Sequence, residues 1–162
     1  MIRTFSVAAL LFAPIMASAA PALPSAPYLP LELATQAAQA ALKTCAAQGH
    51  QVSVAVVARD GATKVLLKAD NSGPHTVSSA QGKAFTSAAM GRSTAGLAEF
   101  IASKPANDGL RDMDSRMVIQ GGGLPIKVDQ VLVGGIGVGG APSGDIDAAC
   151  AAEGLKAIGA TE

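Results

Sequence analysis

The amino-acid sequence predicts an α+β domain in which an antiparallel sheet of about five strands is flanked by helices. Short apolar segments come in pairs joined by tight turns, and such pairs are typical of antiparallel hairpins. Between and after these pairs lie segments whose apolar residues keep to one face of a helix. The chain has 162 residues, enough for one domain with one core, and no internal repeat indicates a second domain.

The first half of the domain is predicted to contain two helices around a pair of strands. Gly49 ends the first helix, and Asp60-Gly61 provides the turn between the strands. The first strand is apolar on both faces, which places it in the centre of the sheet. The expected elements are a helix over 31–48, strands over 52–58 and 64–69, and a helix over 78–90.

The second half is predicted to contain a short helix, three strands and a final helix. Thr94 is the expected cap of the short helix. Asp129 occupies the tight turn between the last two strands, and either Ser143 or Asp145 caps the final helix. The expected elements are a helix over 94–103, a polar loop over 106–114, strands over 117–120, 125–128 and 130–138, and a helix after residue 143.

Eight glycines lie between residues 121 and 140, interleaved with valine and isoleucine. Glycine inside strands indicates a close approach to the backbone, and the neighbour is another backbone, a second subunit or a flat cofactor. Gly135, Gly137 and Gly140 also match the dinucleotide fingerprint G-x-G-x-x-G. Nucleotide binding is excluded because Pro142–Gly144 separates these glycines from the helix and no second parallel strand follows.

The N-terminus has the features of an export signal. Arg3 precedes a short apolar run from Phe5 to Ala13, and Ala17-Ser18-Ala19 forms a cleavage site. The run is too short to span a bilayer, so we expect a periplasmic or secreted protein without stable membrane insertion. The expected organisation is a signal peptide over 1–19, a proline-rich leader over 20–30 and a single domain over 31–160.

Composition narrows the classes of partner. Twelve basic and twelve acidic residues leave no net charge, which argues against nucleic acid. Four phenylalanines, one tyrosine and no tryptophan give no platform on which bases stack. Cys45 and Cys150 are either the two halves of a disulfide, which suits an oxidising compartment, or two free buried thiols.

The sequence contains few residues whose type and spacing indicate a catalytic or metal site. No Ser-His-Asp or Cys-His arrangement is recognisable, so the catalytic residues are unknown. His50 and His75 have no neighbouring ligands at metal-site spacing. His75 precedes a predicted helix in a loop, where its imidazole either ligates a haem iron or is solvated. Lys83, eight residues further on, is either a partner for a carboxylate or a solvated lysine.

A joint pattern in four segments resembles the GlcG/HbpS-type family of haem-binding or haem-degrading proteins. The segments are VAVV at 54–57 running into Asp60-Gly61, AQGKAFTSA at 80–88, GGGLPI at 121–126 and VGGIGVGG at 133–140. Asp147 and the stretch from Ala151 to Gly154 also fit, so the resemblance extends from about Leu31 to Ile158. Two positions depart: Gln130 replaces a frequent glycine, and Gly139 replaces a serine.

The resemblance implies a sheet of about five antiparallel strands in a profilin-like layout, and homo-oligomers from dimers to octamers. It also implies haem as the cofactor, with His75 as the first choice of iron ligand and Thr76 and Thr86 as weaker oxygen donors. A haem propionate would then pair with Lys83 or with one of three arginines, Arg92, Arg111 and Arg116.

Three functions remain open at this point. The first is an exported haem-binding protein that stores, senses or transfers haem, with haem degradation left open. The second is an accessory enzyme for a hydroxy acid or a cobalamin-related compound, with a pocket lined by Lys83, Asp60 and the glycine-rich loop. The third is an oligomeric scaffold without catalysis, in which the glycines serve subunit packing.

Overall fold

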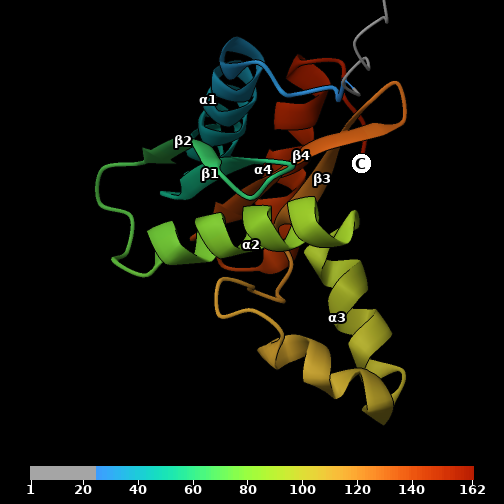
Figure 1. The fold of residues 1–162 in the computed structure, drawn as a ribbon. Coiled ribbons are helices and arrows are strands. Elements are labelled where there is room, and N and C mark those ends of the chain that lie inside the picture. The colour runs from blue at the N-terminus through green and yellow to red at the C-terminus, as the bar shows by residue number, and fades with distance from the viewer. Residues whose placement is uncertain (1–24) are drawn as a thin grey trace, which may run out of the picture.

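The computed structural model describes residues 25–162, so the predicted export signal and the start of the leader lie outside the described residues. Each predicted helix is present close to its expected bounds, which confirms the α+β class (Figure 1). The elements are α1 (Leu31–Ala47), β1 (Ser53–Ala58), β2 (Thr63–Lys68), α2 (Thr76–Met90), α3 (Thr94–Ala102), the 3-10 helix η1 (Pro105–Asp112), β3 (Gly123–Val128), β4 (Val131–Gly139) and α4 (Gly144–Ala157).

The strands form one antiparallel sheet in the order β2-β1-β4-β3. Within residues 25–162 the sheet thus has four strands rather than about five. The expected strand over 117–120 is absent because its backbone bonds to a helix instead. The Val118 N–H donates to the hydroxyl of Thr86 on α2 at 2.9 Å.

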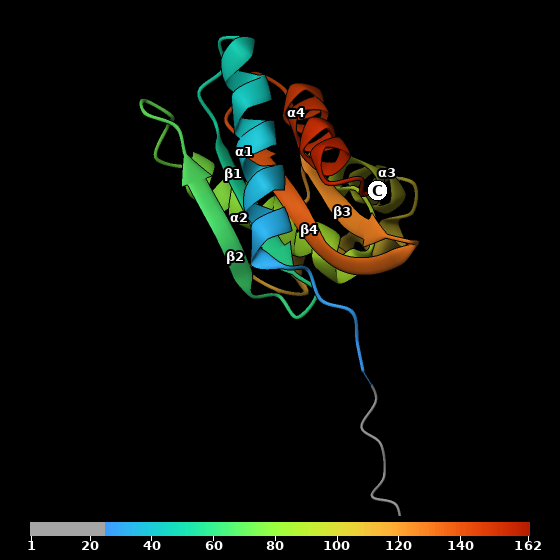
Figure 2. The same ribbon diagram turned by 90° about the horizontal axis from the view of Figure 1, so that it is seen from above.

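Helices cover both faces of the sheet (Figure 2). Helices α1 and α4 pack on one face and enclose the main apolar core, while α2 lies on the other face. Leu29, at the end of the leader, is buried in the main core. Cys45 of α1 and Cys150 of α4 form a disulfide across a sequence separation of 105 residues, which confirms the pairing alternative. Closing a loop of this length stabilises the fold by about 4–5 kcal/mol in the chain-entropy model.

On the face that α2 covers, strand β4 has glycine at the alternate positions 135 and 137 and so presents no side chain to the helix there. A methyl group on Gly137 would lie 2.5 Å from the backbone nitrogen of Ala84, and one on Gly135 would lie 2.7 Å from that of Ala88. Only glycine therefore allows the helix backbone to lie so near the strand. The close neighbour of these glycines is α2 of the same chain. The expectations that they admit a flat cofactor or a second subunit are wrong.

One cap position differs from expectation, and the turn between β3 and β4 contains a left-handed residue other than glycine. Ser93, not Thr94, caps α3 by accepting a hydrogen bond from the Gly96 N–H, because the Thr94 hydroxyl donates to the Gln120 carbonyl at 2.6 Å. In the turn between β3 and β4, Gln130 has a φ of 65°, a left-handed conformation that favours glycine. At the start of α4, Ser143 is the cap of the two alternatives.

The segment expected as a polar loop over 106–114 contains η1. Helices α3 and η1 project together on the α2 side of the sheet, away from the strands (Figure 1). Within residues 25–162, none of the helices has the length and apolar character needed to cross a membrane.

Candidate functional site

Helix α2 and its N-cap carry all four predicted ligand-binding residues and separate two clefts. The first, here called the His75 cleft, has a volume of about 180 Å³ and lies between the start of α2 and the start of α4. The second, here called the Arg116 cleft, has a volume of about 320 Å³ and lies between α2, the β1–β2 hairpin and residues 115–118. The two clefts share no lining residue.

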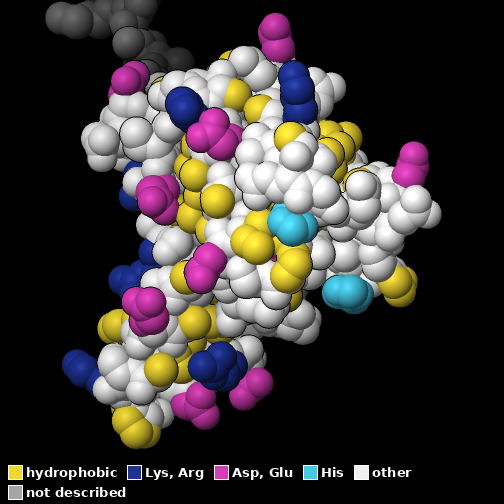
Figure 3. All heavy atoms as spheres, turned by 180° about the vertical axis from the view of Figure 1, so that it is seen from behind, with side chains coloured by type: hydrophobic (Ala, Val, Ile, Leu, Met, Phe, Trp, Pro, Cys, Tyr) yellow, Lys and Arg dark blue, Asp and Glu magenta, His cyan; other side chains and the backbone are white. Residues whose placement is uncertain are grey.

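His75 lies at the rim of the His75 cleft with an exposed imidazole. It occupies the N-cap position of α2 but makes no side-chain cap bond. Its ring lies against Gly73, where an added methyl group would be 2.8 Å from Cε1. Both histidines of the chain reach the surface on the face shown in Figure 3. An exposed imidazole that makes no side-chain hydrogen bond to residues 25–162 is free to act as a ligand.

Lys83 forms the wall of the same cleft, but its ammonium is not free. Its side chain is 2% exposed, and Nζ lies 2.8 Å from Oδ2 of Asp147 on α4. Nζ also donates to the Val138 carbonyl at 3.0 Å, and the other Asp147 oxygen accepts from the Ala141 N–H at 3.0 Å. This buried pair joins α2, the end of β4 and the start of α4. It therefore fixes the shape of the cleft.

The two threonines proposed as oxygen donors are buried and hydrogen-bonded within the protein. Thr76 donates to the Gly73 carbonyl and lies 2.8 Å from the hydroxyl of Ser53 on β1. Thr86 donates to the Gly82 carbonyl and accepts from the Val118 N–H. The structure thus brings His75 and Lys83 to one cleft. Thr76 is the first residue of α2 and contacts β1 through Ser53, and Thr86 holds residues 115–118 through its bond to Val118.

The positions of the His, Cys, Asp and Glu side chains limit the kind of metal that the protein can bind. Among the described residues, no group of three or more His, Cys, Asp or Glu side chains is placed to hold a metal ion. A haem iron needs only an axial ligand from the protein, because the porphyrin supplies the equatorial nitrogens. A single exposed imidazole at a cleft rim fits that requirement.

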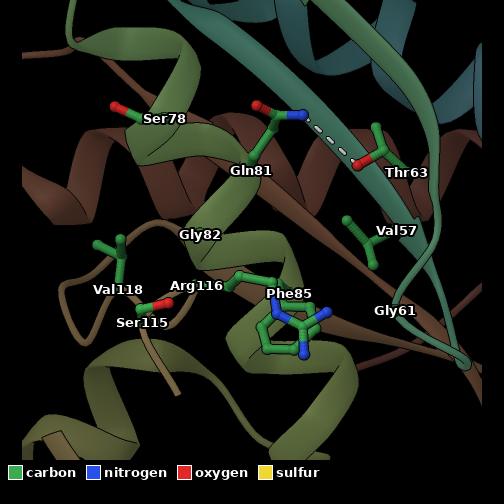
Figure 4. A pocket seen from close by; sticks show the side chains of 10 residues that line it. All are labelled: Val57, Gly61, Thr63, Ser78, Gln81, Gly82, Phe85, Ser115, Arg116 and Val118. Carbon is green, nitrogen blue, oxygen red and sulfur yellow. Dashed lines mark hydrogen bonds between the residues drawn. The ribbon is translucent and has the colours of Figure 1, made fainter. Parts of the chain in front are cut away.

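Sequence reasoning missed the Arg116 cleft. Its cation is the guanidinium of Arg116, which stacks over the ring of Phe85 at 4.1 Å from the centroid (Figure 4). Gln81 of α2 and Thr63 of β2 face one another across the opposite side, 3.5 Å apart. The signal in the sequence was Gly82, an unusual residue inside a helix.

Asp114 also holds the guanidinium of Arg116, by an ion pair along one edge of its plane. Arg116 Nη2 lies 2.6 Å from Oδ2 of Asp114, and Nε donates to Oδ1 at 3.0 Å. These side-chain bonds, with a further bond from the Arg116 backbone N–H, lower the pKa of Asp114 from 3.8 to about 2. The same pair raises the pKa of Arg116. Both groups therefore stay charged over the physiological pH range.

The pocket expected for a small-molecule enzyme is not formed. Asp60 lies beside Phe85 and Arg116, and its carboxylate accepts from the Ala62 N–H within the hairpin turn. Lys83 lines the other cleft. The expectation that Asp60, Lys83 and the glycine-rich loop line one pocket is therefore wrong.

Comparisons with known proteins connect this geometry to solved structures. A family model described as "Haem degrading protein HbpS-like" matches residues 29–156. A double mutant of HbpS from Streptomyces reticuli is 40% identical with a TM-score of 0.78, over 88% of this chain and 97% of that chain. A structure described as a PduOC:Heme complex is 26% identical with a TM-score of 0.75, over 83% and 97% of the chains.

Two further comparisons concern another solved structure and the curated proteins. Protein ORFY of Klebsiella pneumoniae shares the fold, with a TM-score of 0.80 and 24% identity over 90% of this chain and 100% of that chain. A comparison with curated proteins gave no match. The family model and the similarity to HbpS show that this chain belongs to the HbpS-like family.

Proposed function

We propose that this protein is an exported haem-binding protein that holds haem at the His75 cleft. The exposed imidazole of His75 is the observation that carries the proposal, because it offers one nitrogen to an iron at the rim of a cleft. Membership of the HbpS-like family and the similarity to a PduOC:Heme complex support haem as the ligand.

The size of the cleft defines how haem would sit. A volume of about 180 Å³ is below the roughly 300–1,000 Å³ of pockets that enclose a small molecule. Haem held by His75 would therefore extend beyond the cleft instead of being enclosed by it. Because both partners of the Lys83 ammonium are protein atoms, we assign Lys83 and Asp147 to holding the cleft wall. The propionates would then face solvent.

His75 would hold haem by donating a ring nitrogen to its iron, and the iron would supply the ligand-binding chemistry. The His75 ring is oriented by the backbone around Gly73, against which it lies. The Lys83–Asp147 pair keeps the middle of α2 and the start of α4 at a fixed separation. We confine the proposal to binding, which includes storage, sensing and transfer.

A haemin titration tests the proposal. The wild-type protein should shift and sharpen the Soret band with saturation, and His75→Ala should abolish that shift. His50→Ala is the matched control, since His50 lines neither cleft, and it should bind like the wild type. An unchanged spectrum for His75→Ala would remove His75 from the site. Bleaching of the bound haem with ascorbate in air would extend the function to degradation.

Export and assembly are part of the same proposal. The charged, apolar and A-x-A segments of residues 1–19 support export, and the Cys45–Cys150 disulfide suits an oxidising compartment. Mass spectrometry of the protein from its own cells should find a mature N-terminus at Ala20. Light scattering should find a homo-oligomer between a dimer and an octamer. A monomer at all concentrations would contradict the assembly.

A further inference from the structure

We propose that the Arg116 cleft is a second binding site, for a small flat monocarboxylate, and that Arg116 receives the carboxylate. This cleft shares no lining residue with the His75 cleft. The proposal therefore stands or fails independently of haem binding.

The guanidinium of Arg116 has one planar edge left for a ligand. Asp114 takes the other edge, formed by Nε and one hydrogen of Nη2. The free edge consists of Nη1 and the second hydrogen of Nη2. Nη1 faces the lining of the cleft, 3.9 Å from the position that a Cβ on Gly61 would occupy. Two parallel N–H groups at such an edge match the two oxygens of a carboxylate.

The guanidinium is also held in position before any ligand arrives. It is stacked on Phe85 on one face and bonded to Asp114 along one edge. Residues 115–118, which carry it, are pressed against α2 at Gly82, where an added methyl group would lie 2.9 Å from Cβ of Val118. A receptor that is already ordered loses little conformational entropy when it binds.

The walls of the cleft set the shape of the ligand. Its apolar lining comes from Val57, Phe85 and Val118, and its polar lining includes Thr63, Gln81 and Ser115 (Figure 4). The volume of about 320 Å³ is at the lower end of the roughly 300–1,000 Å³ typical of small-molecule sites. It suits one ring with a carboxylate and is too small to enclose a tetrapyrrole.

The test uses benzoate as the probe. Its binding to the full mature chain is measured by the shifts of backbone amide signals in NMR spectra. We expect saturable shifts at residues that line the Arg116 cleft. Arg116→Gln should weaken benzoate binding about tenfold or more, because a charge-assisted hydrogen-bonded pair is lost. Arg92→Gln is the matched control: Arg92 also stacks on an aromatic ring, that of Phe100, but lies outside the cleft. It should bind benzoate like the wild type.

Two analogues separate the parts of the proposal. Benzamide, which keeps the ring and loses the charge, should bind far more weakly than benzoate. Cyclohexanecarboxylate, which keeps the charge and loses the flat ring, should also bind more weakly. Equal binding of either analogue would overturn the corresponding part. Absence of saturable shifts, or equal binding by Arg116→Gln, would overturn the whole. His75→Ala should leave benzoate binding intact, so failure of the haem proposal remains distinguishable.

Discussion

Gly137→Ala tests the packing of α2 on the glycine-rich strand. The new methyl group would lie 2.5 Å from the backbone nitrogen of Ala84 and 3.1 Å from Cβ of Lys83. The nearest obstacle belongs to a helix backbone, which cannot rotate away as a side chain can. The whole helix would therefore have to move from β4, against the other contacts that hold it to the sheet.

The magnitude follows from two opposing effects. Overpacking of a core typically costs about 1–3 kcal/mol, and a rigid backbone obstacle places Gly137→Ala at the upper end. Replacing glycine also restricts the unfolded chain, which returns about 0.4–1 kcal/mol. The net loss of about 2 kcal/mol corresponds to a decrease in Tm of roughly 6 °C for a domain of this size.

Thermal unfolding followed by circular dichroism measures this decrease. Gly109→Ala is the matched control, because a methyl group there meets no atom within 4 Å and the backbone is not left-handed. It should leave Tm unchanged or raise it slightly. Equal Tm values for the two variants would refute the close approach of α2. Loss of haem binding at an unchanged Tm would return the flat cofactor as the neighbour of β4.

Three more predictions concern single contacts. Lys83→Met should lower the free energy of unfolding in urea by about 3–5 kcal/mol, because Asp147 is left buried without its partner; a loss below about 1 kcal/mol would contradict this. Gln130→Gly should raise stability by about 1 kcal/mol in the same assay by relieving a left-handed backbone, whereas a decrease would contradict the turn geometry. The stability that ionised Asp114 contributes should be present above pH 3.8 and be lost as the pH falls through about 2. In the Arg116→Gln variant, NMR titration should find the pKa of Asp114 closer to 3.8.

Local signals predicted most of the fold. Turn residues such as Asp60-Gly61 and apolar periodicity located the hairpins and helices, since both depend on neighbours in sequence. The prediction of a strand over 117–120 was wrong because a short apolar run also occurs in irregular chain that packs against a helix. The N–H of Val118 bonds to Thr86, 32 residues away, and nothing local announces that partner.

The site was predictable only in part. The exposure of His75 was predicted, because a loop before a helix leaves a side chain in solvent, whereas its choice as iron ligand came from the family resemblance and stays a prediction. Lys83 and Asp147 were each noted, but their pairing across 64 residues depends on how α2 and α4 meet. The glycines of β4 showed that something lies close, and only the fold shows that it is α2.

The order of the strands has a consequence for how the polypeptide folds. The two central strands, β1 and β4, lie at opposite ends of the domain sequence, and Ser53 pairs with Gly139. The middle of the sheet cannot close until nearly the whole polypeptide is available, so the apolar β1 must wait for β4. Long-range pairing of this kind slows folding and exposes the nascent chain to aggregation. The export proposed above would benefit from late closure of the sheet, since a narrow protein-conducting channel accepts an unfolded chain.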